Sequence, residues 1–159
     1  MENNDRRLAY RWAVRALSRR MRSISEVRIG LAKKLHPEEV ISSVIDELVD
    51  KGFLDDDQFA HQWVTSRASN RYYGRLRISY ELKGKGIPER TAIKALDLHL
   101  SPEKEAEIAL RAMNKRMQTL RNSGIRGKAA LYRHLEAKGF TPQAIWAALS
   151  TYAPEEEKV

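Results

Sequence analysis

The chain of 159 residues contains no cysteine and no apolar run long enough to cross a lipid bilayer. The lack of cysteine excludes disulfides, thiolate metal sites and cysteine nucleophiles, and it is typical of proteins in a reducing compartment. The N-terminal residues are charged, and no apolar segment of the signal-peptide type follows them. We therefore expect a cytoplasmic protein with no membrane association.

Sites for cofactors and catalysis are equally scarce. The four histidines are scattered without a partner at i+4, so their spacing predicts no zinc site. Residues 124–129 come nearest to a phosphate-binding loop, but the glycine spacing is wrong and Ala129 stands where a hydroxyl residue is needed. The aspartates at 55–57 could be interpreted as metal ligands of a nuclease, although aspartates at a helix start favour capping. We expect no metal, no cofactor and no enzymatic activity.

Charge is abundant and unevenly distributed. Charged residues make up 31% of the chain, and 29 Lys and Arg against 21 Asp and Glu give a net charge of +8. Residues 1–36 carry +7, residues 37–62 carry −7, residues 63–100 carry +5 and residues 101–159 carry +3. The basic excess indicates a polyanionic partner such as nucleic acid. Because phosphates would repel the acidic block, we also expect a protein surface among the partners.

The N-terminal segment follows a helical period. Apolar side chains recur at i, i+3, i+4, i+7 and i+8, which is the spacing of a core-facing stripe. They are Ala9, Trp12, Ala13, Ala16 and Leu17. An arginine stripe lies on roughly the opposite face of the same segment and comprises Arg7, Arg11, Arg15, Arg19 and Arg22. The pattern predicts an amphipathic helix whose outer face is basic.

The sequence also repeats itself. Leu8-Ala9-x-x-Trp12-Ala13 matches Phe59-Ala60-x-x-Trp63-Val64 at an offset of 51, and the same offset aligns two prolines suited to open a helix. A third copy lies at an offset of 53, where Lys85-Gly86-Ile87 matches Lys138-Gly139-Phe140. The first helix of this third copy fits only with a small shift. Self-similarity at such a period is the signature of a repeat architecture.

Each copy has the pattern of three short helices, and no strand pattern competes with it. Three short helices bury little apolar surface alone, so each copy needs its neighbour. The sequence therefore predicts an all-α fold, an elongated, curved array of three tandem three-helix repeats. We expect the repeats at residues 1–54, 55–100 and 101–153, with an acidic tail at 154–159.

Basic residues concentrate in the middle repeat, interleaved with tyrosines; they are Arg67, Arg71, Arg75, Arg77 and Lys85. One interpretation is a solvated charged face. The other is a docking patch for phosphates or acidic side chains, in which the tyrosines cover the apolar stems.

The aromatic residues of the stripes have two interpretations as well. Trp12 and Trp63 could be platforms for stacked bases. They occupy equivalent positions on apolar stripes, however, so we predict that they are buried in the core, as we do for Phe59 and Leu82.

The middle repeat contains a segment specific enough to indicate a family. It closely resembles the signature of the RecX family of bacterial recombinase regulators through Gly52-Phe53-Leu54-Asp55-Asp56-Asp57-x-Phe59-Ala60-x-x-Trp63-Val64-x-x-Arg67, followed by Gly74-x-x-Arg77-Ile78-x-x-Glu81-Leu82-x-x-Lys85-Gly86-Ile87. The flanking repeats are similar to that family too, so the resemblance covers nearly the whole chain.

The resemblance implies a non-enzymatic regulator of RecA, the recombinase that polymerises on single-stranded DNA. Family members are tandem three-helix repeats that lie in the groove of the RecA filament. They mainly inhibit its ATPase, recombinase and co-protease activities in DNA repair, DNA recombination and the SOS response. Arg67, Arg77 and Lys85 match basic positions of the family motif and are our best candidates for partner contacts. We expect a monomer; the alternative function is a stand-alone DNA-binding protein that uses its basic helix faces.

Overall fold

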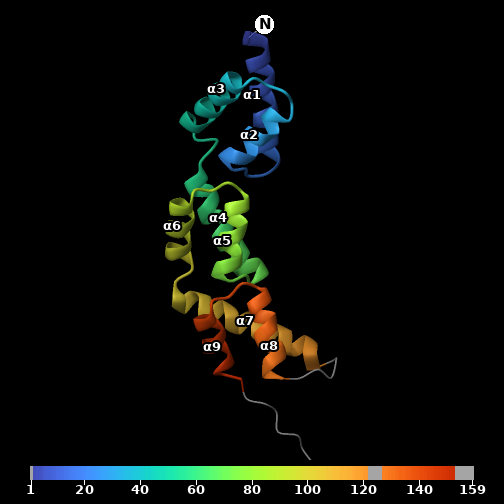
Figure 1. Ribbon diagram of the computed structural model, residues 1–159, viewed down its shortest axis with the longest axis vertical. Coiled ribbons are helices and arrows are strands. Elements are labelled where there is room, and N and C mark those ends of the chain that lie inside the picture. The colour runs from blue at the N-terminus through green and yellow to red at the C-terminus, as the bar shows by residue number, and fades with distance from the viewer. Residues whose placement is uncertain (1, 122–126, 153–159) are drawn as a thin grey trace, which may run out of the picture. The chain divides into compact units, whose positions relative to one another are not determined.

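The structure, a computed structural model, describes residues 2–121 and 127–152, and these form nine helices and no strand (Figure 1). The helices are α1 (Glu2–Arg19), α2 (Ile24–Ala32), α3 (Glu38–Asp50), α4 (Asp56–Arg71), α5 (Arg75–Gly84), α6 (Glu89–His99), α7 (Pro102–Arg121), α8 (Lys128–Ala137) and α9 (Pro142–Leu149). The predicted all-α fold is confirmed. In the ranges that the structure covers, no helix has both the length and the apolar character of a membrane span. The predicted acidic tail at 154–159 and residues 124–126 lie outside those ranges.

The helices begin where the sequence offers caps. Ser23 Oγ accepts the N–H of Glu26 at 3.1 Å, and the Glu26 carboxylate accepts the N–H of Ser23 at 3.2 Å, which is the reciprocal arrangement of a capping box before α2. Pro37, with its φ fixed near the helical value, precedes α3. Asp55 Oδ1 accepts the N–H of Gln58 at 3.0 Å and caps α4. The capping interpretation of the aspartates is therefore confirmed for Asp55.

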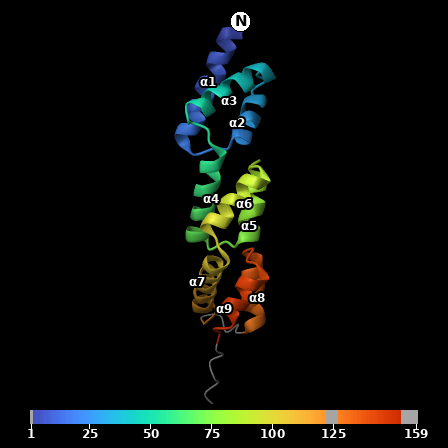
Figure 2. The same cartoon turned by 90° about the vertical axis from the view of Figure 1, so that its left-hand side faces the viewer.

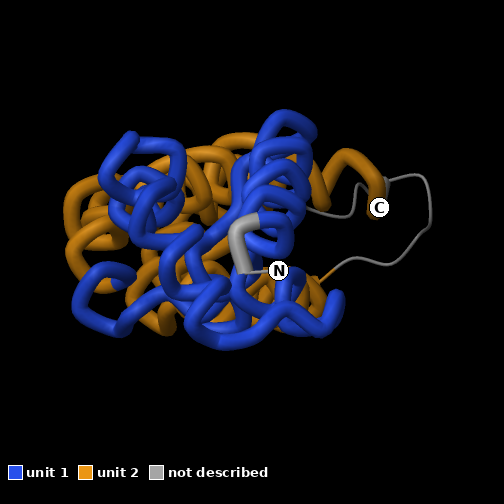
Figure 3. Tube along the Cα trace, turned by 90° about the horizontal axis from the view of Figure 1, so that it is seen from above, with its two compact units in different colours: residues 1–60, 82–92 blue, residues 61–81, 93–159 orange. Residues whose placement is uncertain are grey.

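The chain divides into two compact units (Figure 3). One comprises residues 1–60 and 82–92, and the other comprises residues 61–81 and 93–159. Helices α1, α2 and α3 pack together in the first unit, and α7, α8 and α9 pack together in the second (Figure 2). Helices α4, α5 and α6 each contribute residues to both units. The three repeat boundaries remain a prediction.

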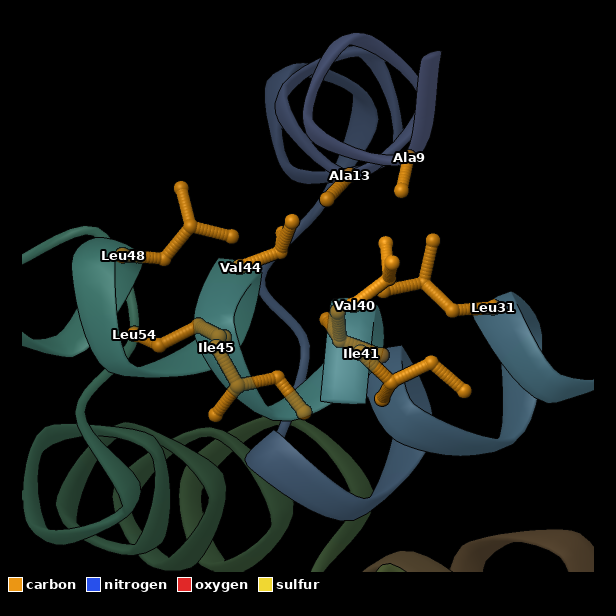
Figure 4. Packing of buried hydrophobic residues seen from close by; sticks show 10 residues of the cluster. Ala9, Ala13, Leu31, Val40, Ile41, Val44, Ile45, Leu48 and Leu54 are labelled. Atoms are coloured by element: carbon orange, nitrogen blue, oxygen red, sulfur yellow. The ribbon is translucent and has the colours of Figure 1, made fainter. Parts of the chain in front are cut away.

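The core of the first unit is built on small residues of α1. Ala9 and Ala13 are fully buried and face the aliphatic side chains of α3, among them Val40 and Val44 (Figure 4). Alanine at these positions lets α3 approach α1 closely, and Leu31 of α2 closes the cluster. Each aliphatic side chain buried in this way contributes about 1.5–3 kcal/mol of hydrophobic stabilisation. The predicted core stripe of the N-terminal helix is thus confirmed for its alanines.

The tryptophans depart from the prediction. Trp12 is only partly buried, and its ring covers Gly30 so closely that a Cβ there would lie 2.1 Å from the ring. Trp63 is also half-buried, because its indole N–H reaches a carboxylate near the surface rather than the core. Phe59 and Leu82 are buried, as predicted. The core prediction is therefore confirmed only in part for Trp12, which packs against the core of the first unit without being fully buried, and it was wrong for Trp63.

Candidate partner-binding surface

The turn after α4 is held against the turn between α8 and α9. The N–H of Gly74 donates to the carbonyl of Lys138 at 2.9 Å, and the N–H of Leu76 donates to the carbonyl of Gly139 at 2.9 Å. A Cβ on Gly74 would lie 2.3 Å from the Cα of Phe140, so only glycine allows the two turns to approach this closely. Two turns that are 64 residues apart in sequence thereby form one rigid surface.

A buried carboxylate holds the same two turns together. Glu105 of α7 is only 2% exposed, and it accepts the N–H of Arg75 at 2.9 Å, the N–H of Thr141 at 3.0 Å and the hydroxyl of Thr141 at 2.7 Å. Its negative charge therefore lies at the N-termini of both α5 and α9, where helix dipoles favour an anion. Sequence analysis missed this residue. Its position in the sequence could have indicated it. Glu105 stands three residues before the buried stripe of α7, and Asp56 stands three residues before the buried Phe59 of α4.

Four basic side chains gather around this pair of turns. They form what we call the Gly74 cationic cluster: Arg71, Arg77, Lys115 and Lys138. Lys138 Nζ donates to the backbone carbonyl of Arg71 at 2.8 Å. Burial, followed by the nearby charges of Lys115, Arg77 and Arg71, lowers the pKa of Lys138. Positive charge at this surface is therefore incompletely compensated, which favours the approach of an anion.

Two tyrosines line the cluster. The Cζ of Arg77 lies 3.8 Å from the ring centroid of Tyr73, and Lys138 Nζ lies 5.3 Å from the same centroid. Lys115 Nζ lies 5.5 Å from the ring of Tyr72. Both rings are partly buried, and it is the charged ends of the basic side chains that lie over them, as in cation–π contacts.

Of the predicted contact residues in the middle repeat, Arg67 and Arg77 meet at one carboxylate. Arg67 Nε lies 2.9 Å from Glu81 Oε2, and Arg77 Nε lies 3.6 Å from Glu81 Oε1. Arg67 also lies over the ring of Trp63 at 4.1 Å, and the indole N–H of Trp63 donates to Glu81 at 3.0 Å. Arg67 is thus engaged within the molecule, whereas Arg77 is shared between Glu81 and the cationic cluster.

The remaining two predicted residues are placed elsewhere. Arg75 forms an ion pair with Asp97. Lys85 lies in the other compact unit, where its Nζ is 2.9 Å from Glu26 Oε1. The structure therefore brings Arg71 and Arg77 together with Lys115 and Lys138 and does not add Arg75 or Lys85 to that group. Sequence analysis missed Lys115 and Lys138 as members because each belongs to a distant helix or turn.

The arginine stripe of α1 is largely as predicted. Arg7, Arg11, Arg15 and Arg19 are exposed. Within the described part of the chain, no carboxylate forms an ion pair with any of these four arginines. Arg22 lies beyond the end of α1, and its Nε donates to the carbonyl of Ala16 at 3.2 Å, so it leaves the stripe.

Comparisons with family models and with known proteins point to the same family. Sequence models of the first and second three-helix domains of RecX match residues 9–48 and 55–96. The chain is 32% identical to the regulatory protein RecX of Halalkalibacterium halodurans over 92% of its own length, but it spans only 55% of that relative. The regulatory protein RecX of Prosthecochloris aestuarii is 32% identical over 91% of this chain and 93% of the relative.

A solved structure agrees with the helical architecture. The crystal structure of RecX from Lactobacillus salivarius matches with a TM-score of 0.83 and covers 93% of this chain and 96% of that one. The sequence identity of this pair is 24%, so the match shows a shared fold. The sequence matches cover most of the chain and agree with this shared fold. The chain therefore belongs to the RecX family.

Proposed function

We propose that this chain is a regulatory protein that binds the RecA filament on single-stranded DNA and slows its ATP hydrolysis, strand exchange and co-protease activity. Support for a regulatory role comes from the family, since its relatives carry the name regulatory protein RecX. The observation that carries the proposed contact surface is the Gly74 cationic cluster. It needs no metal or cofactor to bind an anionic partner.

The cluster suits a partner that presents phosphates or carboxylates. Arginine binds both groups through pairs of parallel hydrogen bonds, and lysine adds a point charge. Arg77 is already held against Tyr73, so less side-chain entropy is lost when it binds. The backbone beneath it is fixed by Gly74 and Gly139, which keeps the charges in a defined arrangement.

The arginine stripe of α1 is the second proposed contact, through Arg7, Arg11, Arg15 and Arg19. Its arginines are exposed on the face opposite the buried alanines. Four other predicted residues are weaker candidates for direct contacts, because each already forms a hydrogen bond or an ion pair within the chain. They are Arg22, Arg67, Arg75 and Lys85. A filament offers repeated surfaces of both protein and DNA, so two separate basic surfaces can act on it together.

The test is RecA-catalysed ATP hydrolysis on single-stranded DNA with increasing amounts of the protein. We expect slower hydrolysis well below one copy per RecA protomer, since a molecule bound along a filament can block its growth or bridge protomers. Unchanged hydrolysis at equimolar protein, with folding verified by circular dichroism, would contradict the proposal.

The second candidate function is direct DNA binding, favoured by the two tyrosines beside the cationic cluster. Bases can stack on such rings while the cations bind phosphates. Salt separates the two functions. Affinity for bare single-stranded DNA through four phosphate contacts should fall with a log–log slope of about −3. Inhibition of RecA at salt concentrations that abolish binding to bare DNA would favour the filament as the partner.

A further inference from the structure

An apolar hollow lies beside the C-terminal half of α1. It has a volume of about 380 Å³, which is within the range of about 300–1,000 Å³ found for binding sites of small ligands. Its walls come from α1, from the segment after α1 and from the turn between α3 and α4, all in the first compact unit. The lining residues are Val14, Leu17, Ser18, Met21, Gly52 and Phe53.

The turn after α3 fixes Phe53 in the wall of this hollow. Gly52 has a φ of 73°, and its N–H donates to the carbonyl of Val49 at 2.9 Å. The N–H of Phe53 donates to the carbonyl of Leu48 at 2.8 Å, which completes a Schellman motif. The next residue, Leu54, is buried, whereas Phe53 is 59% exposed. A rigid turn thus presents an aromatic side chain at the surface, where such residues serve as anchors for partners.

A second hollow of about 380 Å³ continues the first along α1. It shares Val14 and Ser18 with the first and adds Tyr10, Arg11 and Arg15. Residues four apart are neighbours on a helix, so Tyr10, Val14 and Ser18 form one row, and the two arginines form a row beside it. We call the two hollows together the α1 groove. It has an apolar end at Phe53 and a basic end at Arg11.

The apolar end fits an apolar side chain better than a nucleic-acid base. Bases bind single-strand sites by stacking on aromatic rings, and their edges are recognised through hydrogen bonds. Val14, Leu17 and Met21 carry no ring, and the hydroxyl of Ser18 already donates to the carbonyl of Arg15 at 2.8 Å. Such a wall favours burial of aliphatic or aromatic side chains, to which methionine adapts readily.

The basic end fits carboxylates. Arg11 and Arg15 are exposed, and within the described ranges neither forms an ion pair. A guanidinium binds a carboxylate through two parallel hydrogen bonds. Leu17 and Arg11 are six residues apart, or about 9 Å along α1. An extended peptide covers that distance in about three residues.

We propose that the α1 groove binds a protein segment that carries a large apolar side chain and, about three residues away, a carboxylate. The apolar side chain lies against Phe53, and the carboxylate binds Arg11 or Arg15. This assigns protein, and not DNA, to part of the arginine stripe of α1. The proposal rests on the proposed function in taking that segment to belong to the RecA filament.

The groove is tested without RecA, by selecting phage-displayed random peptides on the wild type and on Val14→Glu in parallel. Val14 lines both hollows, so a glutamate there places a charge at the apolar end and repels carboxylates at the basic end. The wild type should enrich peptides with an apolar and an acidic residue about three positions apart, and Val14→Glu should not. Leu8→Glu is the matched control and should enrich the same peptides, since Leu8 is 48% exposed on the same helix, against 40% for Val14. Absence of this pattern, or its enrichment by a folded Val14→Glu, would overturn the proposal.

Fluorescence anisotropy with an enriched peptide then separates the two ends of the groove. Phe53→Ser should weaken binding at least about tenfold, as truncation of an anchoring aromatic does. Arg11→Gln/Arg15→Gln should weaken it more than Arg7→Gln/Arg19→Gln, which removes the same charge from the stripe outside the groove. Circular dichroism and thermal melts verify that each variant is folded. Equal losses from the two arginine pairs would indicate general charge attraction and overturn the proposal.

Single-stranded DNA is the alternative occupant, and fluorescent oligothymidylate is its probe. Phe53→Ser should bind oligothymidylate as the wild type does. A loss as large as that for the peptide would assign the groove to bases and overturn the proposal.

RecA ATPase inhibition connects the groove with the filament. Val14→Glu should inhibit less than Leu8→Glu. If Val14→Glu binds no peptide but inhibits RecA like the wild type, the filament is not the partner of the groove. If the wild type binds the peptides but leaves RecA unaffected, only the proposed function is contradicted.

Discussion

The guanidinium of Arg77 lies on the ring of Tyr73, with 3.8 Å between its Cζ and the ring centroid. This contact orients the central cation of the Gly74 cationic cluster, and the Arg77 side chain as a whole stays exposed to solvent. Because Lys138 lies over the same ring, one aromatic side chain organises two of the four charges.

Tyr73→Ala should weaken inhibition of RecA although it removes no charge. Without the ring, Arg77 and Lys138 gain rotamer freedom that binding must then restrict, at about 0.5–1.5 kcal/mol per side chain. Tyr73→Phe is the control, since it keeps the ring and removes only the hydroxyl. Dose–response curves of RecA ATPase inhibition measure the effect, and equal potency of Tyr73→Ala and the wild type would contradict this role.

Gly74→Ala should destabilise the protein. The new Cβ would lie 2.3 Å from the Phe140 backbone, and neither turn can move without breaking the hydrogen bonds that join them. We expect a loss of about 1–3 kcal/mol in the free energy of unfolding, measured by urea titration. Gly84→Ala is the matched control, because that helical glycine has open space around its Cα and should be stabilised slightly. Equal stability of the two variants would refute the close approach.

Glu105→Ala should lower the free energy of unfolding more than substitution of an exposed acidic residue does. It leaves the N–H groups of Arg75 and Thr141 without their acceptor in a buried place, at about 1–3 kcal/mol for each unsatisfied group. Glu107→Ala, on the exposed face of α7, should lie within about 0.5 kcal/mol of the wild type. Urea unfolding of both variants checks the difference, and hydrogen exchange at Arg75 and Thr141 locates it.

Stability should fall at acid pH partly through Glu26. Burial tends to raise the pKa of this carboxyl, but hydrogen bonds from Arg20, Lys85 and the N–H of Ser23 lower it from 4.5 to about 2. Because the folded value is the lower one, the ionised group stabilises the fold above pH 4.5, and this contribution is lost as the pH falls from 4.5 to about 2. Glu26→Gln should be less stable than the wild type at neutral pH.

The difference between Glu26→Gln and the wild type should shrink towards pH 2, which urea unfolding at a series of pH values measures. Asp56, whose pKa is raised mainly by burial, contributes in the opposite direction in both proteins and cancels in the comparison. Glu89→Gln serves as the exposed control. A constant difference between Glu26→Gln and the wild type across this range would show that Glu26 contributes through packing and not through its charge.

Local sequence patterns were sufficient to predict the helices and the repeat. Alanine spacing in α1, the proline before α3 and Asp55 before α4 each act over a few residues, so they are visible in one segment. Trp63 shows the limit of such patterns. Its place on the apolar stripe predicts burial, but whether a stripe position at the edge of a helix face is covered depends on Glu81, which is 18 residues away.

The candidate surface was predictable only in part for the same reason. Arg71 and Arg77 flank the Gly74 turn in sequence, so they could be proposed together. Lys115 and Lys138 join them through tertiary contacts, and Lys85 was proposed with them because its motif position is similar. Its ion pair with Glu26 separates it from that group, and no local signal reveals this pairing.

The most direct test of the account is RecA ATPase inhibition by the double reversal Arg71→Glu/Arg77→Glu. It is compared with Arg90→Glu/Lys94→Glu, which changes the net charge equally at exposed positions outside the cluster. If the Gly74 cationic cluster binds the filament, the first variant should need at least about tenfold more protein for half-inhibition, a loss of about 1.4 kcal/mol. The control should inhibit like the wild type. A folded Arg71→Glu/Arg77→Glu that keeps wild-type potency would contradict the cluster as the contact surface.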